Sequence, residues 1–159
     1  MAIRNIRMDD DPQLRKKCRN VDAIDDHIRE ILKDMAETMY KAEGAGLAAN
    51  QVGVLRRLVV MDVGEGLIQL VNPEMTMQEG TRVVLEGCLS FPDVWGKVVR
   101  PEKVVVRALD ENGQEITLTG EGLLAKCLCH ELDHLDGIVF TDKVTEYVDI
   151  ESTESETQE

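Results

Sequence analysis

Three side chains toward the carboxyl end of the chain have the types and the spacing of a metal site. His130, Glu131 and His134 form the pattern H-E-x-x-H within the segment CHELDHLDG. On a helix, two histidines four residues apart lie on one face, one turn from each other, so both imidazoles can reach the same ion. Glu131 lies about 100° around the helix from His130, where it can take a proton from an activated water without binding the ion. This is the spacing that metal-assisted hydrolysis requires.

The alternative interpretation is a polar stretch of a surface helix that arose by chance. Two observations favour a metal site instead. The residues just before the motif are largely apolar and include Leu123, Leu124, Ala125 and Leu128, so the helix is expected to be half buried. The motif also contains two of the 3 histidines in the chain.

A metal held by two histidines needs a third protein ligand. The longer pattern H-E-x-x-H-x-x-G-x-x-H is excluded, because position 140 is Phe140. The later glutamates lie in an acidic end segment, and the remaining histidine, His27, lies in the first predicted helix. The candidates are therefore cysteines: Cys88, which follows a glycine in the segment EGCLS, and Cys127, three residues before the motif. Either thiolate beside two imidazoles would leave an open fourth position, and we favour Cys88.

The segment GAGLAANQ, at residues 44–51, is rich in small residues. By itself it is well explained as the glycine-rich end of a helix followed by a tight turn. The functional interpretation is a loop whose backbone approaches a ligand closely, with the Gln51 amide directed at that ligand.

The periodicity of apolar residues predicts two helices with strands between them. Residues 25–42 have helical spacing, with Asp22 or Asp25 as the cap and with Gly44 and Gly46 ending the helix. Residues 121–135 return to helical spacing and carry the two histidines. Strand-like runs lie at residues 57–63, 68–72, 83–88, 97–100, 103–109 and 115–119, with a hairpin turn at residues 110–113. Strands joined by hairpins indicate an α+β fold rather than alternating β/α units.

Composition indicates a globular protein with one domain. The chain has 159 residues, of which 43% are hydrophobic and 31% charged. We expect a single domain over residues 1–145, followed by an acidic, disordered tail over residues 146–159 that has no basic residue. The net charge of −13 makes direct binding to nucleic acid unfavourable.

The N-terminal segment MAIRNIRMDDDP lacks the apolar core of a secretory signal, and no run is long enough to span a membrane. We therefore expect a cytoplasmic protein. Its 4 cysteines should then be reduced thiols, which act as ligands or as buried packing groups rather than as disulfides.

Taken together, the three segments resemble the peptide deformylase family. That family carries G-x-G-x-A-A-x-Q, E-G-C-L-S and H-E-x-D-H in this order, and the chain has them at residues 44–51, 86–90 and 130–134. The resemblance extends from about the N-terminus to Val144. It implies an α+β fold with mixed or antiparallel sheets packed around a central helix that carries the H-E-x-x-H motif. It also implies removal of the formyl group from the N-terminal methionine of newly made proteins, with release of formate.

The resemblance also assigns roles to single residues. Glu131 would do the acid–base work, while Gln51 and the backbone N–H of Leu89 would stabilise the developing oxyanion. The implied metal is Fe²⁺, for which Zn²⁺, Ni²⁺ or Co²⁺ can substitute. The residues assigned to the metal are Cys88, His130 and His134.

The implied substrate is the extended end of an N-formylmethionyl nascent peptide. Its main chain would pair with the backbone near Gly46 and Gly87, in the way that peptides add to a sheet edge. Trp95 would lie at the rim of the site, or else in an ordinary half-exposed loop. No membrane or direct nucleic-acid partner is expected, and a transient ribosome contact is compatible with this substrate. The apolar pocket for the methionine would be formed by Leu89, Leu123 and Cys127.

Two other functions are considered from the sequence. A small zincin-like peptidase would share the H-E-x-x-H motif and cleave internal peptide bonds, but the chain lacks a suitable third histidine or glutamate. A structural metal site in a binding module would need Cys127 or His27 as a fourth ligand. It would leave Glu131 and Gln51 without a role.

Overall fold

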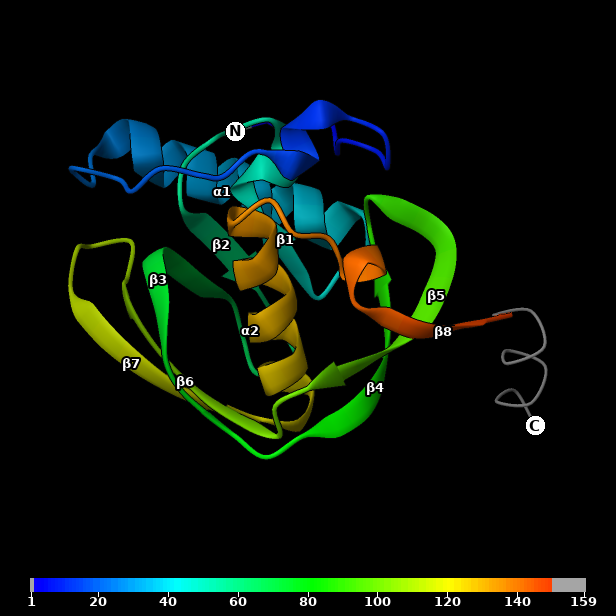
Figure 1. The fold of residues 1–159 in the computed structure, drawn as a ribbon. Helices are drawn as coiled ribbons and strands as arrows, with labels where there is room; N and C mark the ends of the chain where they lie inside the picture. Colours follow the sequence, from blue (N-terminus) through cyan, green and yellow to red (C-terminus); the bar gives the residue numbers. More distant parts are fainter. Residues whose placement is uncertain (1, 150–159) are drawn as a thin grey trace.

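The computed structural model describes residues 2–149, which contain two α-helices and eight strands (Figure 1). Seven of the strands lie between the helices in the chain, and this order confirms the predicted α+β class. In chain order the elements are η1 (Pro12–Arg15), α1 (Asp26–Lys41), β1 (Gly46–Ala48), η2 (Ala49–Val52), β2 (Leu58–Met61), β3 (Ile68–Glu79), β4 (Arg82–Cys88), β5 (Phe91–Arg100), β6 (Lys103–Leu109), β7 (Glu115–Glu121), α2 (Gly122–Leu135), η3 (Phe140–Asp142) and β8 (Val144–Val148), where η marks a short 3₁₀ helix.

The strands form two sheets in which every neighbouring pair of the described strands is antiparallel. One sheet has the order β1-β2-β3-β6-β7, and the other has the order β4-β5-β8. Helix α2 lies between the two sheets, and α1 packs against β1 and β2 (Figure 1). The helix with the two histidines is therefore enclosed by strands from both sheets.

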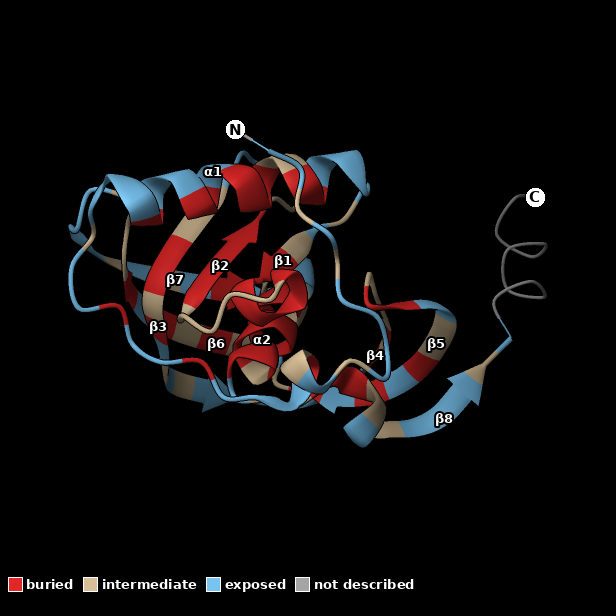
Figure 2. Ribbon diagram, turned by 90° about the horizontal axis from the view of Figure 1, so that it is seen from above, coloured by how far each residue is buried: buried red, intermediate tan, exposed pale blue. Residues whose placement is uncertain are grey.

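Strand β2 shows how the core is layered. All four of its residues are buried, although successive strand residues point to opposite faces. Leu58 and Val60 pack in the cluster that contains α1, whereas Val59 and Met61 pack in the cluster that contains α2. A strand covered on both faces has a continuous apolar sequence without alternation. Figure 2 shows the same layering, with α2 and the neighbouring strand β2 coloured as buried.

Two local signals in the sequence are confirmed. Asp25 caps α1, because its carboxylate accepts a hydrogen bond of 3.0 Å from the backbone N–H of Ile28. The turn between β6 and β7 closes through a hydrogen bond of 3.1 Å from the N–H of Gly113 to the carbonyl of Asp110. Gly113 has φ of 82°, a left-handed conformation that glycine adopts without strain.

The carboxyl end of α1 differs from the prediction. The N–H groups of Glu43 and Gly44 donate to the carbonyls of Tyr40 and Met39, which is the hydrogen-bond pattern of a Schellman motif. A glycine usually occupies the left-handed position of this motif. Here Glu43 occupies it, with φ of 58°, so the left-handed position lies one residue before the predicted Gly44, and the helix itself ends at Lys41.

Two strands lie where none was predicted. β1 has three residues within the glycine-rich segment, and β8 pairs with β5 after a long separation in the chain. Strand β8 runs past the predicted boundary at residue 145 to Val148, while residues 150–159 of the predicted tail lie outside the described residues. No helix in the described residues is both long and apolar enough to cross a membrane.

Leu32 and Lys33 of α1 provide a matched test of this packing. Leu32 is fully buried against β2, whereas Lys33 is exposed. Leu32→Ala should lower the free energy of unfolding by about 2–5 kcal/mol, because it leaves a cavity under the helix. Lys33→Ala should change it by less than about 0.5 kcal/mol. Urea unfolding would measure both values, and equal losses would contradict the described packing.

Candidate metal centre

One face of α2 carries the residues of the H-E-x-x-H motif. Cys127, His130, Glu131 and His134 have the spacing i, i+3, i+4 and i+7, so they form a single stripe along the helix. All four are buried. A helix places this stripe correctly through its own periodicity, and the strands opposite it must supply any further ligand.

Strand β4 brings a third candidate ligand, Cys88, toward α2. Val84, Glu86 and Cys88 are two residues apart, so they share one face of the strand. Val84 and Glu86 are buried, which shows that this face is directed inward. Cys88 is the last residue of the strand and is half-buried. The alternation of β4 thus brings the thiol toward α2.

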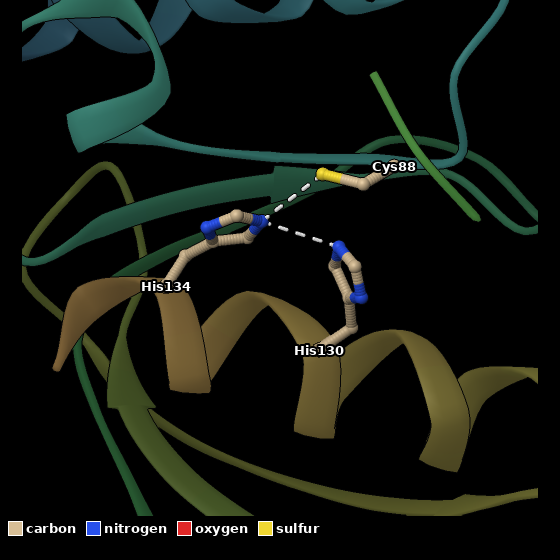
Figure 3. Close-up of side chains that lie close together, drawn as sticks. All are labelled: Cys88, His130 and His134. Atoms are coloured by element: carbon tan, nitrogen blue, oxygen red, sulfur yellow. Dashed lines mark hydrogen bonds between the residues drawn. The ribbon is translucent and has the colours of Figure 1, made fainter. Parts of the chain in front are cut away.

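The side chains of Cys88, His130 and His134 converge (Figure 3). Sγ of Cys88 lies 3.3 Å from Nε2 of His134, and this nitrogen lies 3.2 Å from Nε2 of His130. The three atoms that could bind a metal all lie within 4.8 Å of one another. Among residues 2–149, this is the one such group of histidine, cysteine or acidic side chains.

These three donors fit a transition metal. Metal bonds of about 2.0–2.3 Å in a tetrahedral site would separate such donors by roughly 3.4 Å, close to the contacts seen here. Burial by itself would lower the pKa of His130. Glu131, Cys88 and Glu86 outweigh that effect and raise the pKa, so the groups around this imidazole favour a positive charge at its position. Burial and the charge of His130 lower the pKa of His134 well below its ordinary value, which keeps that imidazole neutral. Three donors also leave room for a water or a substrate oxygen.

A buried ion pair orients His130. Its Nδ1 lies 2.8 Å from Oε1 of Glu86. The same carboxylate accepts two hydrogen bonds from Arg100, of 2.5 Å from Nε and 2.9 Å from Nη2. Arg100 in turn donates to Asp133 of α2 at 2.7 Å. Because Nδ1 is occupied by Glu86, Nε2 of His130 is the nitrogen directed at the converging group.

Glu131 has a buried carboxylate that packs against the glycine-rich segment. Its carboxylate lies against Gly46: a β-carbon at that glycine would be 2.6 Å from Oε2 of Glu131 and 2.9 Å from Sγ of Cys127. Within the described structure, Oε1 of Glu131 is buried without a hydrogen-bond partner. Burial raises the pKa of Glu131 to about 7. A carboxyl group with this pKa can both accept and release a proton near neutral pH.

The 3₁₀ helix η2 orients the amide of Gln51. Its Oε1 accepts a hydrogen bond of 2.9 Å from the backbone N–H of Ala48. Its Nε2 then lies 3.1 Å from Oγ of Ser90 and 3.6 Å from Sγ of Cys88. The NH₂ group of Gln51 is therefore directed toward the converging ligands. Leu89 follows Cys88 directly in the chain and lines the cleft beside these side chains.

A cleft of about 390 Å³ opens beside these side chains. Cys127 lines the cleft, but its Sγ faces the carbonyl of Ala45 at 3.6 Å and does not belong to the converging group. Burial raises the pKa of the Cys127 thiol well above its ordinary value. His27 is exposed on α1. The predicted substrate contacts that line the cleft are Gly46, Gly87, Leu89, Leu123 and Cys127.

A larger hollow of about 730 Å³ borders the opposite stripe of α2. It contains none of the converging ligands. Most of its charged groups are paired with one another: Arg57 with Asp136, and both Arg100 and Lys143 with Asp133. The chemistry therefore belongs to the smaller cleft.

Comparison with known proteins decides the family. The family described as polypeptide deformylase matches residues 3–149 of the chain. The chain belongs to the peptide deformylase family. Peptide deformylase 2 of Clostridium acetobutylicum is 60% identical over 149 residues, which cover 93% of this chain and 99% of that protein. The peptide deformylase of Acetivibrio thermocellus is 58% identical over 154 residues, covering 97% of this chain and 91% of that protein.

Solved deformylase structures have the same fold. The crystal structure of the enzyme from Thermotoga maritima matches with a TM-score of 0.88 at 38% identity and covers 90% of this chain and 98% of that chain. The enzyme from Ehrlichia chaffeensis in complex with actinonin matches with a TM-score of 0.89 at 37% identity, covering 91% and 90%. Peptide deformylases remove the N-formyl group from nascent peptides, so this chain is a hydrolase of protein biosynthesis. The zincin-like peptidase and the non-enzymatic binding module are thereby excluded.

Several contacts of this deformylase site were not predicted, and two of them show what the sequence could and could not reveal. The pairing of Glu86 with His130 could have been suspected, because Glu86 alternates with the apolar Val84 and a buried carboxylate needs a partner. The second contact runs from Nδ2 of Asn50 to the carbonyl of His134 and ties the glycine-rich segment to the end of α2. No sequence pattern indicates that contact, because the two residues are 84 positions apart.

The ion pair of Glu86 and Arg100 gives this deformylase fold a testable pH dependence. Glu86→Ala should lower the free energy of unfolding by about 3–5 kcal/mol at neutral pH, since Arg100 then loses its main buried partner. Burial alone would raise the pKa of Glu86, but hydrogen bonds from Arg100 and His130 lower it from 4.5 to about 2. The stabilisation is therefore complete above pH 4.5 and is lost as the pH falls toward 2. Urea unfolding at several pH values would measure it.

The matched control is the exposed pair of Arg107 and Glu115, which lie 2.8 Å apart. Glu115→Ala should cost less than about 1 kcal/mol, because solvent screens that pair. A Glu86→Ala variant with no greater loss than Glu115→Ala would contradict the role of the buried pair.

Proposed function

We propose that Cys88, His130 and His134 bind the catalytic metal of this deformylase and that Glu131 transfers the proton. The observation that carries the assignment is the convergence of three ligand atoms within 4.8 Å beside the unpartnered Oε1 of Glu131. When bound, the metal supplies Lewis acidity and lowers the pKa of a water near it. We propose Fe²⁺ as the native ion, with Zn²⁺, Ni²⁺ or Co²⁺ as substitutes, because imidazole and thiolate donors suit several of these ions.

Glu131 accepts the proton of the attacking water on its carboxylate and holds it there. Its raised pKa, about 7, supports this role, because the protonated form can exist long enough at neutral pH to serve as an acid. Glu131 then gives the proton to the nitrogen of the leaving peptide. The products are formate and a peptide with a free N-terminus.

Gln51 and the backbone N–H of Leu89 donate hydrogen bonds to the formyl oxygen as negative charge develops on it. The bond between Oε1 of Gln51 and the N–H of Ala48 supports this role, since it holds the NH₂ group in one direction. Donors that are oriented before the reaction stabilise the transition state without a cost of reorganisation.

The substrate is the extended N-formylmethionyl end of a nascent peptide. β1 and β4 are edge strands of their sheets and both contribute to the cleft, which supports pairing of the peptide backbone beside Gly46 and Gly87. Such main-chain pairing does not depend on the peptide sequence. The methionine side chain would contact the apolar part of the wall, formed by Leu89, Leu123 and Cys127.

We further propose that the enzyme acts in the cytoplasm, where formylated peptides leave the ribosome, and that it touches the ribosome only transiently. The catalytic domain would extend beyond the predicted boundary at residue 145 to Val148, where β8 ends, and an acidic tail would follow it. The net charge of −13 argues against direct binding to nucleic acid.

Glu131→Gln tests the proton transfer. The amide keeps the shape of the side chain but cannot accept the proton, so formate release from a formyl-Met tripeptide should fall by roughly 10²–10⁴-fold. The protein should be prepared without air and loaded in parallel with Fe²⁺ and Zn²⁺. Glu121→Gln, at the exposed start of the same helix, is the control and should keep full activity. Undiminished release by Glu131→Gln would remove Glu131 from the mechanism.

Cys88→Ala and Cys127→Ala separate the two cysteines that the sequence leaves as candidate ligands. Cys88→Ala removes one of three converging donors, so metal content should fall well below one ion per chain after dialysis. Cys127→Ala should retain about one ion per chain, because its thiol faces the carbonyl of Ala45 instead. Elemental analysis of the dialysed proteins would measure both. The opposite pattern would assign the metal to Cys127.

A further inference from the structure

The buried amide of Asn50 joins three segments that are distant from one another in the chain. Asn50 belongs to η2 and is fully buried. Its Nδ2 donates to the carbonyl of His134, near the end of α2, and to the carbonyl of Lys16 at 3.4 Å. Both acceptors are carbonyl oxygens, so it is the amino group of the amide that must face them. Asn50 therefore ties η2 to the end of α2 and to the N-terminal segment.

The environment of this amide is unfavourable for folding. Within the described structure, Oδ1 of Asn50 is buried without a hydrogen-bond partner, and such an atom destabilises the folded state. The carbonyl of His134 also accepts a hydrogen bond of 2.9 Å from the N–H of Gly137, so it would keep a donor if Asn50 were replaced. Stability by itself therefore gives little reason for an amide at this position.

The two histidines of the metal centre are held in different ways. Glu86 contacts Nδ1 of His130 and so orients its ring. Nδ1 of His134 is buried and has no hydrogen-bond partner within the described residues. Histidines that bind a metal usually need a further partner that fixes them. For His134 this partner acts on the backbone, where Asn50 holds the carbonyl.

Asn50 is also the direct neighbour of Gln51 in the chain. The amide of Gln51 is directed toward the converging ligands, with its Nε2 3.6 Å from Sγ of Cys88. The backbone of Gln51 is fixed as well, because its carbonyl accepts a hydrogen bond of 2.6 Å from the N–H of Arg7. The contact of Asn50 with His134 therefore sets the separation between the proposed oxyanion donor and a proposed metal ligand.

We propose that Asn50 is a positioning residue of this deformylase, which holds His134 and Gln51 at a fixed separation. Asn50 does not line the cleft, so it acts through these two neighbours and not on the substrate. Groups that are held in place before the reaction need less reorganisation in the transition state. This inference rests on the proposed function, because it concerns a proposed metal ligand and a proposed oxyanion donor.

Asn50→Ala tests this role, with Asn72→Gly as the matched control. The amide of Asn72 makes the same kind of tie outside the cleft, because it accepts from the N–H of Val21 at 2.7 Å and donates to its carbonyl at 2.9 Å. Glycine removes both bonds without straining the backbone at this position, where φ is 52°. In competition with a chelator, Asn50→Ala should bind Zn²⁺ roughly 10–100-fold more weakly than the native protein. Asn72→Gly should keep the native affinity.

Two further measurements separate positioning from a general loss of stability. The absorption spectrum of the Co²⁺-loaded protein reports how the thiolate and imidazole donors are arranged, so it should change in Asn50→Ala and stay native in Asn72→Gly. With a formyl-Met tripeptide, kcat of Asn50→Ala should fall roughly 10–100-fold while KM stays nearly unchanged, because Asn50 does not line the cleft. Asn50→Ser leaves a smaller cavity and carries the same comparison if Asn50→Ala does not fold.

The outcomes separate this inference from the proposed function. Native Zn²⁺ affinity and native kcat in Asn50→Ala would refute the positioning role and leave the catalytic assignment intact. Equal losses in Asn50→Ala and Asn72→Gly would refute it as well, because a general loosening of the fold would then explain both. Retention of the metal by Cys88→Ala as tightly as by the native protein would instead refute the proposed ligands themselves.

Discussion

The carboxylate of Glu86 connects three elements around one histidine. It comes from β4, accepts two hydrogen bonds from Arg100 of β5 and contacts Nδ1 of His130 on α2. Taking these charged groups out of water is costly, and the arrangement is tolerable because their hydrogen-bonding groups find partners inside the protein. Arg100 extends the network back to α2 through Asp133. The direction of the His130 ring, and with it the converging group, depends on this network.

Two glutamates near His130 have opposite environments. Glu86 has a pKa lowered to about 2 by its hydrogen bonds with Arg100 and His130, so it remains a carboxylate and can orient its neighbours. Glu131 lacks such partners, and burial raises its pKa to about 7. One carboxyl group is therefore fixed in its charge, while the other can exchange a proton near neutral pH. Such a separation of pKa values between neighbouring groups is how protein environments give chemically identical side chains different roles.

Much of the fold could be predicted because its signals are local. The helical spacing of α1, its cap at Asp25 and the turn that ends at Gly113 depend on residues a few positions apart. The α+β class follows from the order of these elements. Strand β1 was missed because it has only three residues, and β8 was missed because it depends on pairing with β5, which lies far from it in the chain. The left-handed residue after α1 was wrongly predicted to be a glycine, because Glu43 takes a conformation that favours glycine.

In the candidate site, too, some features follow from local sequence spacing and others only from the packing of distant elements. By itself the sequence determined that His130 and His134 lie on one helix face, with Glu131 about 100° around the helix from His130, because the 3.6-residue period of the helix requires it. It left two cysteines as candidates for the third ligand. Only the tertiary structure decided that Cys88 lies beside the imidazoles, because its position depends on the packing of β4 against α2. The same applies to the contact of Glu86 with His130, which links residues 44 positions apart and has no local pattern that would specify the partner.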